Sequence, residues 1–314
     1  MLNRRHIRIK VMQTIFSNEG KHISDFAQME GFLNKSMDGM FDLYLNILAL
    51  LISIQNRFEE QLEKTQRKKL ATETDKNPNL KFVRNRVLTS LNANKLLKDT
   101  ILRKGLNTWE LDFEYVEILY KAIIEHPLYR QYMSSETSNL QEDKMFIADL
   151  FSEVIAPNEK LYEYFEDKKL TWTDDYAVVN TFIVKRIKKY KENKSERYFL
   201  PDLFKDKEDH DFGIQLLEKT VLNESLLYGE VAKRTKNWDA DRLALIDGIL
   251  LKMAICELQN FPSIPVKVTI NEYLEIAKEY STPKSSNFIN GILDKTVKEY
   301  KSENLYPKSG RGLM

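Results

Sequence analysis

Apolar residues recur every three or four positions along nearly the whole chain, and this spacing constrains the fold most strongly. Spacing of this kind places apolar side chains on one face of a helix. No segment alternates with the period of two that a strand requires, and 10 Gly and 8 Pro among 314 residues are too few for a turn-rich β protein. The sequence therefore predicts an all-α protein. The clearest run comprises Met37, Met40, Phe41, Tyr44, Ile47, Leu48, Leu51, Ile54 and Phe58.

The same spacing locates further helices and the breaks between them. Two charged stretches, residues 64–76 and 191–211, are expected to be loops. Thr269 and Glu272 have the spacing of a capping box, and Thr282 precedes Pro283 as an N-cap precedes a first-turn proline. Further helices are predicted at about 82–103, 114–125, 142–155, 158–168, 175–190, 212–233, 240–260, 270–280 and 283–300.

Composition indicates a soluble globular chain without a general affinity for polyanions. It has 48 basic and 47 acidic residues and a net charge of +1, so any nucleic-acid site must be a local patch. The single cysteine, Cys256, excludes an intrachain disulfide and is expected in the core. The most apolar stretch, residues 43–54, is too short to span a bilayer, and no secretion signal is visible. A cytoplasmic location is expected.

No motif of an enzyme is present in the sequence. It lacks a G-x-S-x-G elbow, a P-loop and a glycine-rich dinucleotide turn, and its four histidines show no metal-ligand spacing. We therefore expect no catalytic residues, no metal and no cofactor. The sequence favours a binding protein.

The C-terminal third carries the most specific motif. Residues 264–272 read IPVKVTINE, and residues 281–295 read STPKSSNFINGILDK. This pair of runs resembles the signature of the NusB family of transcription antitermination factors. Residues 249–258, ILLKMAICEL, and the basic first helix from Asn3 to Phe16 are similar to two further family segments. Gly291 lies within the last predicted helix, at a cost of about 1 kcal/mol against alanine, which is expected where another backbone approaches closely.

The pieces that resemble the family are far apart in the chain. The resemblance therefore implies a discontinuous NusB-like helical bundle, residues 1–20 plus 205–301, followed by a flexible tail, residues 302–314. Residues 21–204 are predicted to be a large helical insertion of unknown role, packed as a lobe of its own with its ends close in space. Its basic segments, residues 67–69 and 185–191, are interpreted as solvated charge, with an extension of an RNA surface as the alternative.

The start of the first helix is the main candidate for RNA binding. Arg4, Arg5, Arg8 and Lys10 all precede the first acid, Glu19. On a helix their stripe begins basic and becomes apolar, so its arginine end is expected to protrude past the core. Guanidinium groups suit phosphate and base contacts. The alternative is a solvated helix start, although cations there oppose the helix dipole. The resemblance favours RNA.

The resemblance implies a second RNA contact area at the start of the last helix. A helix N-terminus offers free N–H groups to phosphate. There Phe288 either stacks on a base or belongs to the core, and both interpretations stay open. The residues concerned are Lys284, Ser285, Asn287 and Phe288.

The family's protein partner is NusE, a ribosomal protein, and the resemblance carries two contact positions over to Phe16 and Asp247. Asp247 is a lone acid on an apolar helix, so an internal partner is the alternative. The implied function is binding of boxA-like single-stranded RNA together with NusE, within the RNA polymerase antitermination complex, on rRNA operons in particular. The alternative from another class is a protein–protein scaffold that has lost RNA binding.

Overall fold

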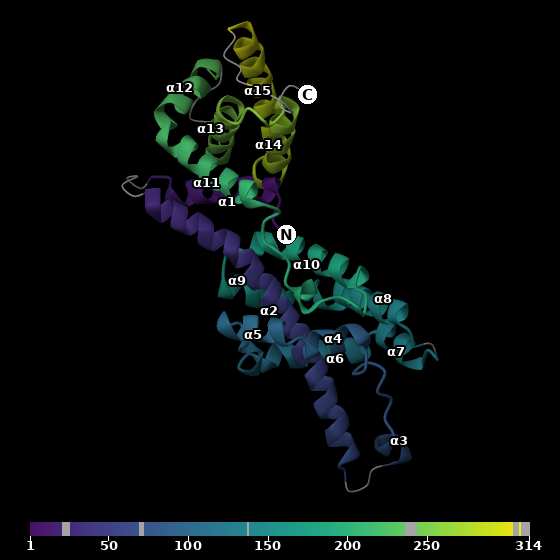
Figure 1. Cartoon of the computed structure of the whole chain (residues 1–314). Coiled ribbons are helices and arrows are strands. Elements are labelled where there is room, and N and C mark those ends of the chain that lie inside the picture. Colours follow the sequence, from purple (N-terminus) through teal and green to yellow (C-terminus); the bar gives the residue numbers. More distant parts are fainter. Residues whose placement is uncertain (21–25, 69–71, 137, 236–243, 304–307, 309–314) are drawn as a thin grey trace. The chain divides into compact units, whose positions relative to one another are not determined.

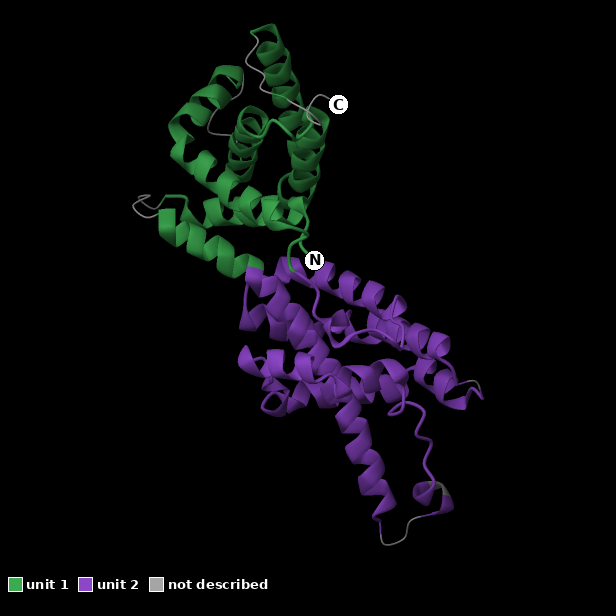
Figure 2. Ribbon diagram, viewed as in Figure 1, with its two compact units in different colours: residues 1–37, 203–314 green, residues 38–202 purple. Residues whose placement is uncertain are grey.

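The computed structural model describes residues 1–20, 26–68, 72–136, 138–235, 244–303 and 308. These residues form helices joined by turns and contain no strand, so the predicted all-α class is confirmed. The chain divides into two compact units (Figures 1 and 2). Unit 1 comprises residues 1–37 and 203–314, and unit 2 comprises residues 38–202.

Unit 1 is built around one helix, α13, which packs against α1, α11, α12, α14 and α15. Residues 249–258 of α13 are all buried, including the thiol of Cys256, and burial raises its pKa to about 11. A helix that is apolar on all sides has to be surrounded by others. The helices of unit 1 are α1 (Arg4–Asn18), the beginning of α2 (Phe26–Gln66), α11 (Lys207–Leu222), α12 (Glu224–Arg234), α13 (Leu245–Asn260), α14 (Val266–Tyr280) and α15 (Ser285–Ser302).

The two sequence-distant parts of unit 1 meet where α1 crosses α11. Gly213 allows this close packing, because a Cβ at this position would lie 2.7 Å from Cγ2 of Ile7. The terminal amine of Met1 and the backbone N–H of Leu2 both donate to the carbonyl oxygen of Leu203, at 2.9 and 2.8 Å. The start of the chain is thereby joined to the segment that leads into α11.

Unit 2 is organised around the remainder of α2, whose residues 43–52 are all buried. Indole N–H groups of Trp109 and Trp172 donate to α2 carbonyl oxygens of Asn46 and Gly39, at 2.9 and 2.7 Å. The other elements are α3 (Glu73–Lys76), α4 (Arg86–Ala93), α5 (Lys95–Arg103), η1 (Thr108–Glu110), α6 (Phe113–Glu125), α7 (Pro127–Ser134), α8 (Leu140–Leu150), the π-helical turn η2 (Phe151–Ile155), α9 (Glu159–Lys168), α10 (Trp172–Lys188) and η3 (Glu196–Phe199).

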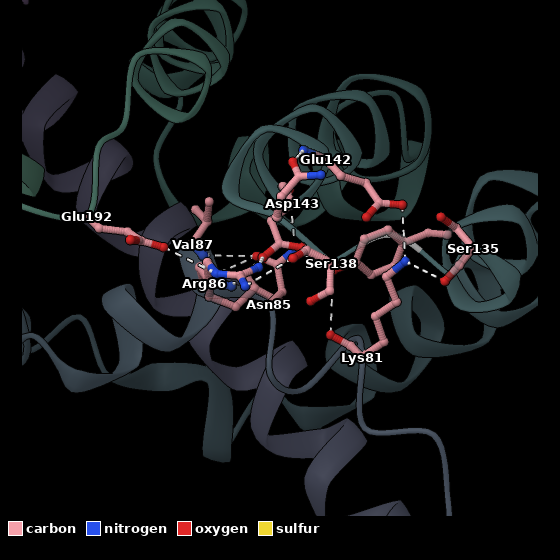
Figure 3. Close-up of polar contacts among 12 residues, drawn as sticks. Lys81, Asn85, Arg86, Val87, Ser135, Ser138, Glu142, Asp143 and Glu192 are labelled. Carbon is pink, nitrogen blue, oxygen red and sulfur yellow. Dashed lines mark hydrogen bonds and ion pairs between the residues drawn. The ribbon is translucent and has the colours of Figure 1, made fainter.

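A polar cluster links α4, α7 and α8 of unit 2 (Figure 3). The buried carboxylate of Asp143 accepts hydrogen bonds from the backbone N–H and the guanidinium of Arg86, at 3.1 and 2.8 Å, and from the hydroxyl of Tyr132 at 2.7 Å. Lys81 donates to Glu142 at 3.1 Å and to the carbonyl oxygen of Ser135 at 3.0 Å. Because buried polar groups are costly when unpaired, this network fixes the three helices together.

Several predicted helix boundaries are wrong, for local reasons. The run 82–103 divides into α4 and α5 at Asn94, whose side chain caps α5 by accepting from the N–H of Leu97. The run 212–233 similarly divides at Asn223. Residues 64–66, expected in a loop, continue α2, where pairs such as Glu60–Lys64 at i, i+4 support the helix. The unpredicted α7 begins with Pro127 at its first position. Of the predicted segments, residues 21–25, 69–71, 137, 240–243, 304–307 and 309–314 lie outside the described residues.

Residues 26–37, the beginning of α2, belong to unit 1 and not to unit 2, which holds most of the predicted insertion. Met29, Leu33 and Met37 are buried there. By length and composition α2 could also cross a membrane, but 78% of its most apolar window is buried inside the structure. Such burial is typical of a helix in the core of a folded unit.

Candidate RNA- and partner-binding surface

Arg8 lies in the core of unit 1 and forms a buried ion pair. Its Nε and Nη2 donate to the two carboxylate oxygens of Glu257 on α13, at 2.8 and 2.7 Å. Burial opposes the charge of Arg8, but the attraction of Glu257 and the hydrogen bonds to it raise the pKa of Arg8 above its ordinary value. Thr269 and Tyr273 of α14 donate to the same carboxylate, at 2.8 and 3.2 Å. The expectation that the whole arginine end protrudes is therefore wrong for Arg8.

Arg4 and Arg5 are half-buried and are also paired. Nε of Arg4 donates to Asp209 at 2.8 Å, and its Nη2 donates to Glu208 at 3.3 Å. Arg5 makes a two-pronged pair with Glu272, with both distances 2.9 Å. That hydrogen bonding raises the pKa of Arg5 and lowers the pKa of Glu272. The side chains of Arg4 and Arg5 remain 35% and 40% exposed, so both residues are partly accessible.

Lys10 is buried, contrary to the prediction of a protruding basic stripe. Its ammonium donates to the hydroxyl of Ser36 on α2, at 3.2 Å. Lys10 lies more than one turn into α1, at the level where Val11 and Met12 already belong to the core. Accessible positive charge at this end therefore comes from Arg4 and Arg5.

An open hollow of about 690 Å³ lies beside these two arginines. His6 contributes to its wall, and burial lowers the pKa of His6 to about 4, with help from the nearby charges of Lys10 and Arg5. A neutral imidazole there leaves the arginines as the cationic groups of the wall. The hollow is lined by Asn3, Arg4, Arg5, His6, Arg8, Ser263, Ile264, Pro265, Val268 and Glu272.

The C-terminal motif forms the other wall of this hollow. Its helix, α14, begins at Val266 after Pro265, so Thr269 and Glu272 already lie inside the helix and the predicted capping box is wrong. These residues instead reach across to other helices, Thr269 to Glu257 and Glu272 to Arg5. The motif thus holds the first helix in place.

The second predicted RNA area is partly buried. Ser285 is buried and donates to Asp247 at 2.7 Å, whereas Lys284 and Asn287 are exposed and Phe288 is half-buried. Helix α15 begins at Ser285, two residues after Pro283, so the predicted Thr282 cap is wrong. None of these residues lines the hollow at α1.

The expected close approach at Gly291 is also wrong, because a Cβ at this position would have no neighbour within 4 Å among the described residues.

The two predicted partner-contact residues differ in accessibility. Phe16, near the end of α1, is 47% exposed. Asp247 is 5% exposed, and its carboxylate accepts hydrogen bonds from the hydroxyls of Ser281 and Ser285, at 2.6 and 2.7 Å. Asp247 therefore has internal hydrogen-bond partners, which was the alternative interpretation of this lone acid on an apolar helix.

The acids that pair with the arginines were missed in the sequence. Glu257 is a single acid in an apolar helical run, and a fully buried carboxylate needs a partner. The same signal is present at Asp247, which is also buried and has internal partners. Asp209 carries no such signal, because acids are common on exposed helix faces, and the position of Glu272 was explained by the predicted capping box. In the described residues, no group of three or more His, Cys, Asp or Glu side chains could hold a metal ion.

Comparison with known proteins identifies relatives of part of the chain. The model of the NusB family matches residues 176–298, which begin in unit 2, inside the predicted insertion, and continue into unit 1. The chain is similar to the transcription antitermination protein NusB of Chloroherpeton thalassium, with 41% identity over 129 residues, which cover 41% of this chain and 61% of that protein. No solved structure matches the chain significantly.

Two further relatives carry the same name. The protein from Salinibacter ruber is 38% identical over 112 residues, which cover 36% of this chain and 70% of that protein. The protein from Clostridium kluyveri is 40% identical over 93 residues, which cover 30% of this chain and 60% of that protein. The matches thus span 61%, 70% and 60% of the three relatives. Together with the all-helical fold and the C-terminal motif, these identities show that the chain belongs to the NusB family.

Proposed function

We propose that this chain is an RNA-binding transcription antitermination factor of the cytoplasm and not an enzyme. It binds boxA-like single-stranded RNA together with NusE, and so keeps RNA polymerase processive through terminators, on rRNA operons in particular. The observation that carries the proposal is the pairing of the family's C-terminal motif with the basic first helix in one unit, through Glu272 and Arg5. The names of the relatives, which are antitermination proteins, support the same function.

The proposed RNA contact at α1 uses Arg4 and Arg5. Each side chain stays partly exposed and lines the hollow, while its acidic partner fixes the orientation of the guanidinium. A planar, oriented guanidinium suits phosphate and stacked bases. The proposal keeps Lys284, Asn287 and half-buried Phe288 as a second contact area, and exposed Phe16 as a NusE contact.

A titration with boxA-like RNA, with and without NusE, tests the function. Binding should tighten when NusE is present and weaken with salt, by a slope of about 0.7 per phosphate contact on a single strand. Arg5→Ala should weaken binding. Glu272→Gln breaks the same ion pair but leaves the arginine, so it should preserve or strengthen binding. Equal losses in both variants would show that only the ion pair matters, and would remove Arg5 from the RNA site.

The scaffold without RNA binding remains the second candidate, and one observation favours it. Arg4, Arg5 and Arg8 all form ion pairs inside unit 1, so part of their charge is already neutralised. Retained NusE binding with no measurable affinity for boxA-like RNA, at low salt and in the presence of NusE, would establish the scaffold and exclude the antitermination mechanism.

A further inference from the structure

The end of α10 and the chain that follows it form the most basic segment of unit 2. Residues 185–197, here the α10–η3 basic segment, hold seven basic residues and two acidic ones. Lys185 and Lys188 in the last turn of α10 and its C-cap Lys189 are exposed and lie on one face at spacings of three and four. Three more exposed cations follow beyond the helix end: Lys191, Lys194 and Arg197. The helix dipole stabilises cations in the last turn of a helix, but it does not explain the three cations that lie beyond the helix end.

This positive charge is left largely uncompensated. Among the described residues, only Lys188 of the seven cations has an ion-pair partner, Asp149 at the long distance of 3.9 Å. One of the two acids, Glu192, pairs with Arg86 at 3.2 Å, as Figure 3 shows. The arginines of α1 are all paired with acids, whereas this segment presents its cations to solvent.

An arginine stacked on an aromatic ring lies within the segment. The guanidinium carbon of Arg186 is 4.1 Å from the ring centroid of Tyr198, and the hydroxyl of Tyr198 donates to the carbonyl oxygen of Arg186 at 2.7 Å. Lys194 lies 5.6 Å from the same ring. Arg186 and Tyr198 are both half-buried. Nε of Arg186 is enclosed and its guanidinium carbon also lies 5.8 Å from the ring centroid of Phe182, so only part of the stacked pair can meet a ligand. Stacked arginine and tyrosine beside phosphate-binding cations are typical of surfaces that bind single-stranded nucleic acid.

The segment is held rigidly although it is mostly loop. The η3 turn packs against α5, and the side-chain amide of Asn94 donates to the carbonyl oxygen of Glu196 at 2.8 Å. The hydroxyl of Tyr190 donates to that of Ser90 at 2.7 Å. A fixed backbone lowers the entropy that ordering the cations around a ligand would cost.

We propose that the α10–η3 basic segment is a further RNA-binding surface, separate from the two contact areas of unit 1. It binds the sugar–phosphate backbone of single-stranded RNA that flanks the boxA-like element. The proposal rests on the proposed function, because RNA held at unit 1 supplies flanking nucleotides at high effective concentration. A flexible single strand reaches such a surface without a fixed arrangement of the two units. RNA is favoured over an acidic protein because the stacked Arg186–Tyr198 pair offers a platform for bases beside the cations.

The test uses the full chain and three RNAs: a short boxA-like RNA, the same RNA with an unstructured flank of about 15 nucleotides, and the flank alone. The variant is Lys185→Gln, Lys189→Gln, Lys191→Gln and Lys194→Gln together, which leaves the Arg186–Tyr198 stack untouched. The matched control neutralises four exposed cations elsewhere in unit 2: Lys64 in the last turn of α2, Arg67 and Lys68 just after it, and Lys76 in α3. Three of these have ion-pair partners within their own helices or adjoining turn.

In the parent and the control, the flank should tighten binding of the boxA-like RNA by about tenfold or more and steepen its salt dependence. The variant should lose this gain while it binds the short RNA as the parent does. Circular dichroism should show that all three proteins are folded. An unchanged gain in the variant, or an equal loss in the control, would overturn the proposal.

The three RNAs and an acidic peptide distinguish failure of the proposed function from failure of the proposed surface. If the short RNA does not bind but the flank alone binds the parent and not the variant, the proposed function fails and this surface stands. If the short RNA binds and its flank adds nothing, this surface fails alone. An acidic peptide that displaces the flank RNA as well as an RNA of equal charge does would overturn the RNA assignment in favour of a protein partner.

Discussion

At the scale of single residues, the fold should depend most on both partners of the buried Arg8–Glu257 pair, because each is needed to keep the charge of the other in the core. Their side chains are 2% and 0% exposed. Removing one partner leaves an uncompensated charge in the core, which costs about 3–5 kcal/mol. Glu257→Gln should lower the free energy of unfolding in urea by that amount. Glu272→Gln, which breaks the half-exposed pair with Arg5, should cost about 1 kcal/mol or less. Similar losses in the two variants would contradict the buried-pair account.

His6 should make unit 1 sensitive to acid. Its pKa is lowered to about 4 in the folded chain, against about 6.5 when unfolded. The folded state therefore binds fewer protons between these values, so stability is full above pH 6.5 and declines as the pH falls toward 4. The decline from this residue should be about 1–3 kcal/mol. His6→Asn should flatten the curve of unfolding free energy against pH in this window. Parallel curves for the variant and the parent would exclude His6 as the cause.

At the scale of helices, Asp247 joins α13 to the start of α15. Asp247→Ala would leave the hydroxyls of Ser281 and Ser285 without their acceptor, at a cost of about 1–3 kcal/mol. Asp247→Asn keeps one acceptor oxygen and should cost less. Thermal unfolding measures both changes. NusE binding should be measured at a temperature where both variants are folded. A loss of binding that is seen only at higher temperatures would come from unfolding and not from a lost contact with NusE.

The polar cluster of Figure 3 should determine how firmly α4, α7 and α8 stay together. Asp143→Ala removes the acceptor of both Arg86 and Tyr132, and we expect a loss of about 2–3 kcal/mol in unit 2. Hydrogen exchange should become faster in these three helices and stay unchanged in α13. Uniform acceleration along the whole chain would show that the two units unfold together.

At the scale of the whole molecule, the division between the units predicts where the chain can be cut. Replacing residues 38–202 by a flexible linker of about ten residues should leave a soluble, helical unit 1. Replacing residues 21–204 removes Met29, Leu33 and Met37 from the core, and also Ser36, which accepts a hydrogen bond from Lys10. The second product should be far less stable in a thermal melt. An aggregated first product would show that the two units depend on each other.

The sequence alone determined the all-α class and the family. Helical periodicity is local, because residues three and four apart share a face whatever surrounds them, so most helices could be located. The family motif is a linear run, so it could be recognised without a fold. Helix ends were less predictable, because caps such as Asn94 compete with continuation of the helix, and the outcome depends on the packing of the neighbouring helices.

Only the tertiary structure decided which charges are available for binding. Arg8 is paired with an acid 249 positions away and Arg5 with one 267 positions away, so no window of sequence contains both partners. The basic run of α1 therefore looked uncompensated in the sequence, but its three arginines are paired with acids in the folded chain. The α10–η3 basic segment looked like ordinary solvated charge and keeps most of its cations unpaired. The physical reason is that a charge is compensated by its neighbours in space, and folding alone selects them.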